Sequence, residues 1–263
     1  MYDFNYHRPA KAAEATALIK KHRDGTLMSG GMTLIPTMKQ RLASPSDVID
    51  LSGLGNNAIK AMKTKITIGA GTTHAEVATN RDVKKAIPAL AALAGGIGDP
   101  HVRHKGTLGG SIANNDPAAD YPAGLVALDA TVITTKRKLP ADRFFRGMFE
   151  TALARDEIVT AVEFPVPKRA GYAKFPNPAS RYAMVGVFVA DHGKEIRVAV
   201  TGAGASVFRH KAMEKALGKS FRPETAESIA TNADGLNEDI HASADYRAHL
   251  VGIMAKRAVA SAK

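Results

Sequence analysis

The chain has 263 residues, of which 45% are hydrophobic, so it can bury a substantial core and form one large domain or two smaller ones. It contains no cysteine, which excludes disulfides, thiol nucleophiles and cysteine-ligated iron–sulfur clusters within this chain. The formal net charge is +11, but the basic residues are spread over separate segments, so a solvated basic surface or an acidic partner subunit explains them better than specific nucleic-acid recognition.

Residues 1–55 are expected to form the first part of the chain. The alanine-rich stretch 10–21 ends in cations and predicts a helix. A short strand at 26–28 precedes a glycine segment, and a helix over 34–42 and a strand over 48–51 follow it. This order places the glycine segment at the exit of a strand.

Residues 56–167 are expected to form the second part, which begins with a period-2 strand over 65–71. Thr73 and Glu76 have the spacing of a capping box, so a helix is predicted to begin at His74. A helical stretch over 84–93 is interrupted at Pro88, strands are predicted at 131–134 and 158–164, and Pro165 with Pro167 closes this part.

Residues 168–263 have a different order of elements. Three strands come first and helices follow, which favours an α+β domain with a three-stranded antiparallel sheet over alternating βαβ units. The turn composition of residues 191–194 predicts a hairpin between the last two strands. The expected elements are strands at 172–175, 184–190 and 196–201, and helices at 210–217, 223–231 and 245–261.

Two glycine-bearing segments carry most of the functional information. Residues 29–36 read Ser-Gly-Gly-Met-Thr-Leu-Ile-Pro, and residues 107–111 read Thr-Leu-Gly-Gly-Ser. Each can present backbone N–H groups, unobstructed by Cβ atoms, to a phosphate. Ordinary turns are the alternative for either segment alone. The pair together predicts a pyrophosphate held from two sides, as in a dinucleotide cofactor.

The second segment continues into residues 111–122, which add hydroxyl, amide and carboxylate groups. Such groups suit the hydroxyls of a ribose or a ribityl chain, because a carboxylate accepts their hydrogen bonds. For Asp116 and Asp120 the alternative is a loop held by Asx turns.

Other chemistries find little support in the sequence. Gly69-Ala70-Gly71 and Gly202-Ala203-Gly204 begin like dinucleotide fingerprints, but the third glycine is replaced by His74 and Val207. There is no P-loop sequence and no G-x-S-x-G elbow. His101 and His104 lack a carboxylate or cysteine at a zinc-binding spacing, so no metal site is expected. The pattern that is left indicates a cofactor-binding scaffold.

The segments 29–36, 97–111 and 116–123 resemble those of the FAD-binding medium subunits of molybdenum hydroxylases. This family includes the medium chain of aerobic carbon monoxide dehydrogenase and the FAD domain of xanthine dehydrogenase. The resemblance extends from residues 4–9 to residues 244–250, and therefore covers nearly the whole chain.

The resemblance implies an α+β fold in which a two-part FAD-binding domain of the p-cresol methylhydroxylase and vanillyl-alcohol oxidase type precedes a C-terminal α+β domain. It also implies an electron-transfer subunit that takes electrons from the [2Fe–2S] clusters of a small subunit and passes them to an external acceptor. The molybdenum cofactor would lie on a large subunit of the same heterotrimer. A stand-alone flavin-dependent oxidoreductase of the same fold is the alternative.

The resemblance assigns cofactor-binding roles to particular residues. The first glycine segment and the second would contact the FAD pyrophosphate, and Asp120 would bind the ribityl or ribose portion. Lys174 matches a position that approaches the flavin, with a surface lysine on an edge strand as the alternative. His101, Arg103 and His104 could face the flavin or form an ordinary basic loop. The expected cofactor-binding residues are Ser29, Gly30, Gly31, Met32, Thr33, Leu34, Thr107, Gly109, Gly110, Ser111, Asn114, Asp116, Asp120 and Lys174.

The sequence also bears on location. Residues 1–4 lack the basic and apolar regions of a secretory signal, and no apolar run approaches the roughly 20 residues that a membrane span requires. A cytoplasmic location is therefore expected. The substrate of the complex and the terminal acceptor, whether NAD, a quinone or oxygen, leave no signature in this chain.

Overall fold

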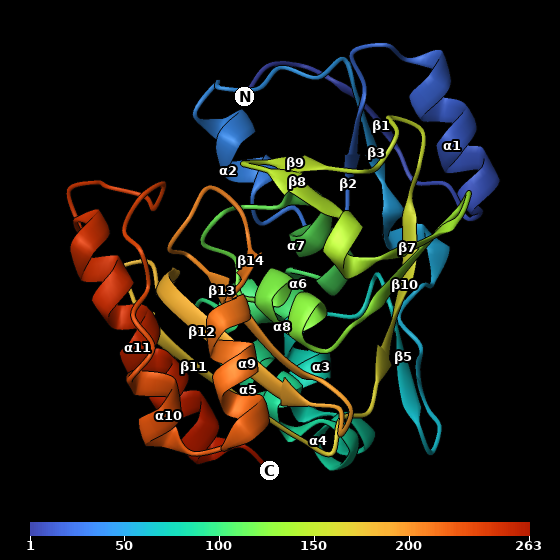
Figure 1. The fold of residues 1–263 in the computed structure, drawn as a ribbon. Helices are drawn as coiled ribbons and strands as arrows, with labels where there is room; N and C mark the ends of the chain where they lie inside the picture. Colours follow the sequence, from blue (N-terminus) through green and yellow to red (C-terminus); the bar gives the residue numbers. More distant parts are fainter.

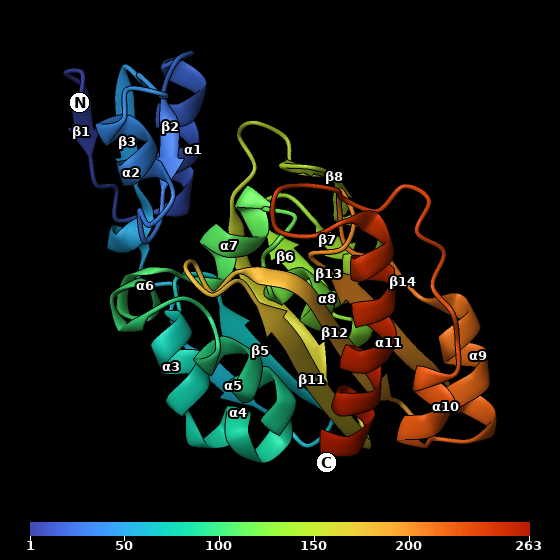
Figure 2. The same cartoon turned by 90° about the vertical axis from the view of Figure 1, so that its left-hand side faces the viewer.

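The computed structural model describes residues 1–263, and three main sheets organise them (Figure 1). The first sheet is parallel, with strand order β1-β3-β2, and it forms a lobe that stands apart at the upper left of Figure 2. Its core is small, since Ala15, Ile19 and Ile49 of this lobe cluster with Ile158 of the second part. Its elements are β1 (Asn5–His7), α1 (Ala12–Lys21), β2 (Thr26–Met28), α2 (Leu34–Lys39), β3 (Asp47–Asp50) and the 3-10 turn η1 (Leu51–Leu54).

The second sheet is antiparallel, with strand order β4-β5-β10-β6-β7. The expected strands at its centre are confirmed, and the capping box of Thr73 and Glu76 starts α3 as predicted. Pro88 does begin a new helix after α4. The elements are β4 (Ile59–Ala61), β5 (Lys65–Gly69), α3 (His74–Thr79), α4 (Arg81–Ala86), α5 (Pro88–Gly95), α6 (Pro100–Lys105), α7 (Leu108–Asn114), α8 (Tyr121–Ala127), β6 (Thr131–Thr134), β7 (Lys138–Pro140), η2 (Ala141–Arg143), the β8–β9 hairpin (Phe145–Gly147, Glu150–Thr151) and β10 (Val159–Pro165).

The third sheet is antiparallel, with strand order β11-β12-β13-β14. It contains the three expected strands, the expected hairpin between β12 and β13, and a fourth, short strand, β14, that the sequence pattern did not predict. The C-terminal part is therefore α+β as expected, with a four-stranded sheet in place of three strands. Its elements are β11 (Arg169–Pro176), β12 (Ala183–Asp191), β13 (Ile196–Thr201), β14 (Phe208–Arg209), α9 (Lys211–Lys219), α10 (Pro223–Glu227) and α11 (Ala244–Ser261).

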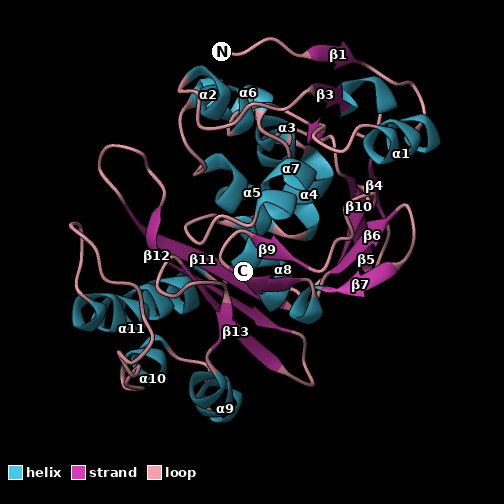
Figure 3. Ribbon diagram, turned by 90° about the horizontal axis from the view of Figure 1, so that it is seen from above, coloured by secondary structure: helices cyan, strands magenta, loops and turns pink.

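The helices α5 and α8 lie between the second and third sheets (Figure 3). A continuous core of 30 buried residues includes side chains from these helices and from both sheets. The other face of the third sheet is covered by α9 and α11, around a second core of 15 residues. Both faces of β12 are thus covered, and all nine of its residues are buried, which explains its nearly continuous apolar sequence.

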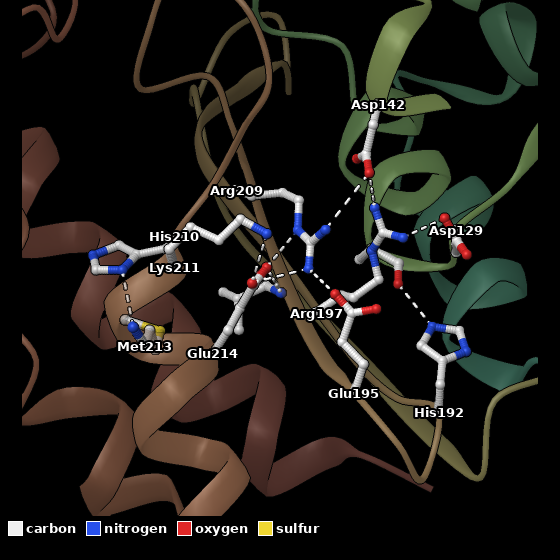
Figure 4. A network of polar contacts seen from close by, with 12 residues as sticks. Asp129, Asp142, His192, Glu195, Arg197, Arg209, His210, Lys211, Met213 and Glu214 are labelled. Carbon is white, nitrogen blue, oxygen red and sulfur yellow. Dashed lines mark hydrogen bonds and ion pairs between the residues drawn. The ribbon is translucent and has the colours of Figure 1, made fainter. Parts of the chain in front are cut away.

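A polar network joins the third sheet to the second part (Figure 4). The Arg197 side chain on β13 is only 4% exposed and binds both Asp129 and Asp142, which lie beyond α8 and in η2. On β14, Arg209 binds Glu214 at 2.7 Å and lies 3.5 Å from Asp142. Because a buried guanidinium needs paired carboxylates, this network fixes how the third sheet sits on the second part.

Three short helices, α6, α7 and α8, occupy residues 100–127, for which the sequence analysis specified no helix. The Asp99 side chain caps α6 by accepting a hydrogen bond from Val102 N at 2.8 Å, and Pro100 occupies the first turn. Every residue of α8 is buried, so packing rather than an amphipathic pattern stabilises it. No helix of the chain combines the length and the apolar character that crossing a bilayer requires.

Candidate functional site

A cleft of about 1050 Å³ lies where the N-terminal lobe meets the second part of the chain. The exit of β2, the start of α7 and the 3-10 turn η1 all contribute to its walls. Residues 180–182, from the loop between β11 and β12, reach it from the third sheet. Both glycine segments line this cleft, so the fold brings together two stretches that lie about 80 residues apart in the sequence, as Ser29 and Thr107 do.

The first glycine segment connects β2 to α2, and its backbone has unused donors. None of the N–H groups of residues 29–34 donates a hydrogen bond within the chain. Gly31 has φ +71°, a left-handed conformation that glycine adopts without a steric penalty. This conformation lets successive N–H groups converge. A row of unpaired N–H groups that lines a cleft is the arrangement that anions such as phosphates favour.

The backbone of the second glycine segment is already paired. Leu108 N donates to Thr72 O at 3.0 Å, and Gly109 N donates to Ala70 O at 2.8 Å. Gly110 N donates to the Thr107 side chain at 3.1 Å, which caps α7. The polar groups left for a ligand here are therefore side chains: Ser111 Oγ and the Asn114 amide make no hydrogen bond within the chain, and both residues line the cleft.

The two segments also contact each other directly. Ser29 Oγ and Thr107 Oγ1 are 2.8 Å apart and share a hydrogen bond. A Cβ atom added at Gly30 would lie 1.8 Å from Lys105 O, so only glycine allows this approach of the lobe to the turn before α7. A Cβ atom added at Gly110 would lie 3.0 Å from Thr107 Oγ1 and 3.4 Å from Ser29 Cβ. Glycine at these positions therefore allows the two segments to lie in contact on opposite sides of the cleft.

The expected acidic residues have separate surroundings. Asp116 lines the cleft, and its Oδ1 accepts a hydrogen bond from Ala118 N at 2.9 Å, which is an Asx turn. Asp120 also lines the cleft but is 4% exposed, and it binds Lys174 Nζ at 2.9 Å and the Tyr172 hydroxyl. Burial raises the pKa of Asp120 above its ordinary value, and the Lys174 ammonium and the Tyr172 hydroxyl oppose that rise.

Lys174 is therefore a paired side chain, only 10% exposed, on a strand of the third sheet. Besides Asp120 it binds the carbonyl oxygen of Gly96 at 2.8 Å. Gly96 precedes Ile97 and Gly98, which line the cleft, whereas Lys174 itself does not. Lys174 therefore binds the backbone directly beside the wall of the cleft.

The basic residues of α6 are arranged around the same wall. Arg103 donates to the carbonyl oxygens of Ile97 at 3.1 Å and Gly98 at 3.0 Å. His104 lines the cleft and bonds through Nδ1 to Pro100 O at 2.7 Å, whereas His101 is exposed outside it. Arg103 thus supports the loop at the cleft.

His74 is a cleft residue that no sequence pattern indicated. It begins α3, lines the cleft and is 5% exposed, and its Nδ1 atom has no hydrogen-bond partner. Burial lowers its pKa to about 4, and the Arg103 charge adds to the effect. Its ring lies 5.4 Å from that of Tyr121, whose buried hydroxyl is also without a partner. The capping box located α3, but no sequence signal marked its first residue as buried.

Acidification is expected to destabilise the fold through His74. Its pKa is about 4 in the folded chain and 6.5 without burial, so the unfolded state binds more protons between these values. The stability present above pH 6.5 is lost as the pH falls towards 4, by up to about 3 kcal/mol from this residue. Urea unfolding of the wild type and His74→Gln across this window measures the difference. If the free energy of unfolding changes with pH by the same amount in the two proteins, the expectation is contradicted.

Comparison with known proteins places the chain. A family model described as "FAD binding domain in molybdopterin dehydrogenase" matches residues 2–167, and one described as "CO dehydrogenase flavoprotein C-terminal domain" matches residues 170–262. The chain is 35% identical to the nicotine 6-hydroxylase medium subunit of Paenarthrobacter nicotinovorans, over 98% of this chain and 96% of that protein. It is 31% identical to the carbon monoxide dehydrogenase medium chain of Hydrogenophaga pseudoflava, again over 98% and 96%.

Solved structures agree. The Hydrogenophaga pseudoflava carbon monoxide dehydrogenase that lacks the Mo-pyranopterin moiety of its cofactor matches with a TM-score of 0.88 and 32% identity, over 99% of this chain and 97% of that one. Quinoline 2-oxidoreductase from Pseudomonas putida 86 matches with a TM-score of 0.90 and 27% identity, over 98% and 96%. The chain therefore belongs to the family of FAD-binding medium subunits of molybdenum hydroxylases, and it is an oxidoreductase subunit.

Proposed function

We propose that this chain binds FAD in the cleft and serves as the electron-transfer subunit of a molybdenum hydroxylase complex. In this role it takes electrons from [2Fe–2S] clusters on a small subunit and passes them to an external acceptor. A large subunit holds the molybdenum cofactor and the substrate. The observation that carries the proposal is the row of unpaired N–H groups of residues 29–34, which lines a cleft large enough for a dinucleotide.

The residues of the cleft fit FAD. The first glycine segment supplies N–H donors for a pyrophosphate, and the polar side chains of Ser111 and Asn114 supply donors and acceptors from the other side. Asp116 retains a free carboxylate oxygen for a ribose or ribityl hydroxyl. For Asp120 and Lys174, which are paired with each other, we propose that they hold the wall beside the flavin.

The protein contributes binding and orientation, whereas FAD, when bound, supplies the ability to accept electrons singly and deliver them in pairs. Because the chain has no cysteine, it offers no thiolate to an iron–sulfur cluster, and the clusters of the complex belong to another subunit. The domain division proposed here, with parts at 1–55, 56–167 and 168–263, assigns one main sheet to each part. A cytoplasmic complex is part of the same proposal.

Replacement of Gly110 by valine tests the cleft as the FAD site. Its branched side chain would press on Thr107 Oγ1 and Ser29 Cβ, which lie 3.0 and 3.4 Å from an added Cβ atom, and would separate the two segments. We expect a folded protein that has lost FAD, measured by circular dichroism and by flavin absorbance of the purified chain. Gly218→Ala, where an added Cβ atom meets nothing within 4 Å, is the control. Stoichiometric FAD in Gly110→Val would refute the assignment.

Purification of the native complex tests the electron-transfer role separately. The expected results are co-purification with an iron–sulfur protein and a molybdenum protein, and loss of electron transfer from reduced clusters to an external acceptor in Gly110→Val. A chain that purifies alone and whose flavin is reduced directly by an organic substrate would instead support the stand-alone oxidoreductase. The two experiments distinguish a wrong site from a wrong role.

A further inference from the structure

A second cluster of ligand-type side chains lies in the N-terminal lobe. His7 Nε2 is 2.7 Å from Asp47 Oδ1, and His22 Nδ1 is 3.0 Å from Asp47 Oδ2. The three ligand atoms lie within 4.8 Å of one another, and the ring centroids of the two histidines are 5.3 Å apart. None of these residues lines the cleft, so the cluster plays no part in the site described above.

We propose that His7, His22 and Asp47 bind a divalent transition metal of the zinc class and so tie together three segments of the N-terminal lobe. Two imidazoles and one carboxylate form a ligand set that zinc accepts, with solvent in the remaining position. The side chains of His7 and His22 are 27% and 24% exposed, so an ion and its water can reach them, whereas the Asp47 side chain is 3% exposed.

The distances allow the ion to enter with small movements. At zinc bond lengths of about 2.0–2.1 Å, two ligand atoms of a tetrahedral site lie about 3.4 Å apart. The two histidine–carboxylate contacts, at 2.7 and 3.0 Å, need to open by about 0.7 and 0.4 Å to reach that separation. Each neutral imidazole then turns a lone pair to the ion and carries its N–H on the other ring nitrogen, which makes no hydrogen bond within the chain.

The backbone holds each ligand in place. His7 is in β1 opposite Ile49 of β3, and Asp47 begins β3. His22 ends α1, where its N–H donates to Leu18 O. Ser46 Oγ donates to Asp47 Oδ2 at 2.7 Å, an outer-sphere contact of the kind that orients metal-binding carboxylates.

The position of the cluster also suits an ion that stabilises the N-terminal lobe. The lobe contributes only Ala15, Ile19 and Ile49 to its buried apolar cluster. A bound metal adds most to the stability of a domain whose hydrophobic core is small. The strand β3 pairs with β2, which ends where the unpaired N–H groups of the cleft begin. A metal at this cluster would stabilise the part of the lobe that carries the FAD-binding segment, although its binding does not depend on the proposed function.

The test uses the untagged full-length chain after treatment with a chelator and dialysis. Titration with Zn²⁺ by calorimetry near neutral pH is expected to show one high-affinity site and a rise in the thermal midpoint, with no response to Mg²⁺. His22→Gln and Asp47→Asn are expected to lose more than about 100-fold in Zn²⁺ affinity, and Ser46→Ala about 10-fold. His249→Gln, an exposed histidine on α11, is the matched control and should leave binding unchanged.

One further result separates a metal site from hydrogen bonds alone. Binding of Co²⁺ should give the visible absorption of a low-coordinate nitrogen and oxygen site, and this absorption should be absent in Asp47→Asn even if that variant has a lower thermal midpoint. No Zn²⁺ binding by the wild type, or equal binding by Asp47→Asn and His249→Gln, would overturn the proposal and leave two histidines hydrogen-bonded to one carboxylate.

Discussion

Replacing Gly30 by alanine is expected to weaken FAD binding strongly while leaving most of the chain folded. The new methyl carbon would lie 1.8 Å from Lys105 O and 2.9 Å from Gly106 Cα, both of which are backbone atoms that cannot rotate away. The N-terminal lobe must therefore shift from the start of α7. Overpacking of this kind costs about 1–3 kcal/mol, which corresponds to a loss of roughly 5- to 150-fold in affinity.

Fluorescence titration of the apoprotein with FAD measures this loss, and thermal unfolding of the same samples reports the effect on the fold. Gly218→Ala serves as the control because its added methyl group meets open space on α9, where alanine is the better helix former. Unchanged FAD affinity in Gly30→Ala would show that the contact between the lobe and residues 105–106 does not shape the binding site.

Replacing Asp120 by alanine is expected to lower the free energy of unfolding more than any other single substitution considered above. This change leaves the Lys174 ammonium in a site where it is only 10% exposed, without its carboxylate. Breaking one half of a buried ion pair costs about 3–5 kcal/mol, because the remaining charge stays desolvated. Urea unfolding should show this loss in Asp120→Ala, and part of it should be recovered in the double variant Asp120→Ala/Lys174→Met, which removes the unpaired charge as well.

Glu238→Ala provides the matched control, since it also removes one negative charge but from an exposed side chain without a hydrogen bond or ion pair. If the double variant is as unstable as Asp120→Ala alone, the loss comes from the Tyr172 contact or from the cavity, and the ion pair is not the cause. If Asp120→Ala unfolds at the urea concentration of the wild type, the pair contributes nothing to stability.

The regular elements with local signals could be predicted from the sequence. The strands of the third sheet have long apolar runs, and the turn composition at 191–194 identified the hairpin between β12 and β13. The capping box of Thr73 and Glu76 located the start of α3. The boundaries were less accurate: α2 ends at Lys39, three residues early, because Arg41 adopts a left-handed conformation with φ +61°.

The helix α7 illustrates what local patterns miss. Its sequence contains two adjacent glycines, which disfavour a helix by intrinsic propensity. The helix forms because Leu108 N and Gly109 N bond to the carbonyl oxygens of Thr72 and Ala70, and because Thr107 caps it. Those carbonyls lie more than thirty residues away, so no pattern within the segment indicates them.

The same reason limits prediction of the site. The sequence located both glycine segments in what the structure shows to be one cleft, but it did not reveal that only the first has unpaired N–H groups. It treated Asp120 and Lys174 as separate residues, whereas the fold pairs the residue before α8 with a strand of the third sheet. The cluster of His7, His22 and Asp47 likewise has no spacing that a zinc motif would show, since three segments meet only after folding.

Lys174 lies on the third sheet and donates a hydrogen bond to the carbonyl oxygen of Gly96. Through this bond the third sheet supports a wall of the cleft, at Ile97 and Gly98, that Lys174 does not itself line. A fragment that stops at residue 167 would include both glycine segments and the Arg103 contacts with Ile97 and Gly98, but it would lose the hydrogen bond from Lys174 to Gly96. The two regions matched by separate family models, residues 2–167 and 170–262, are therefore linked at the wall of the cleft, because a side chain of the second region binds the backbone of the first.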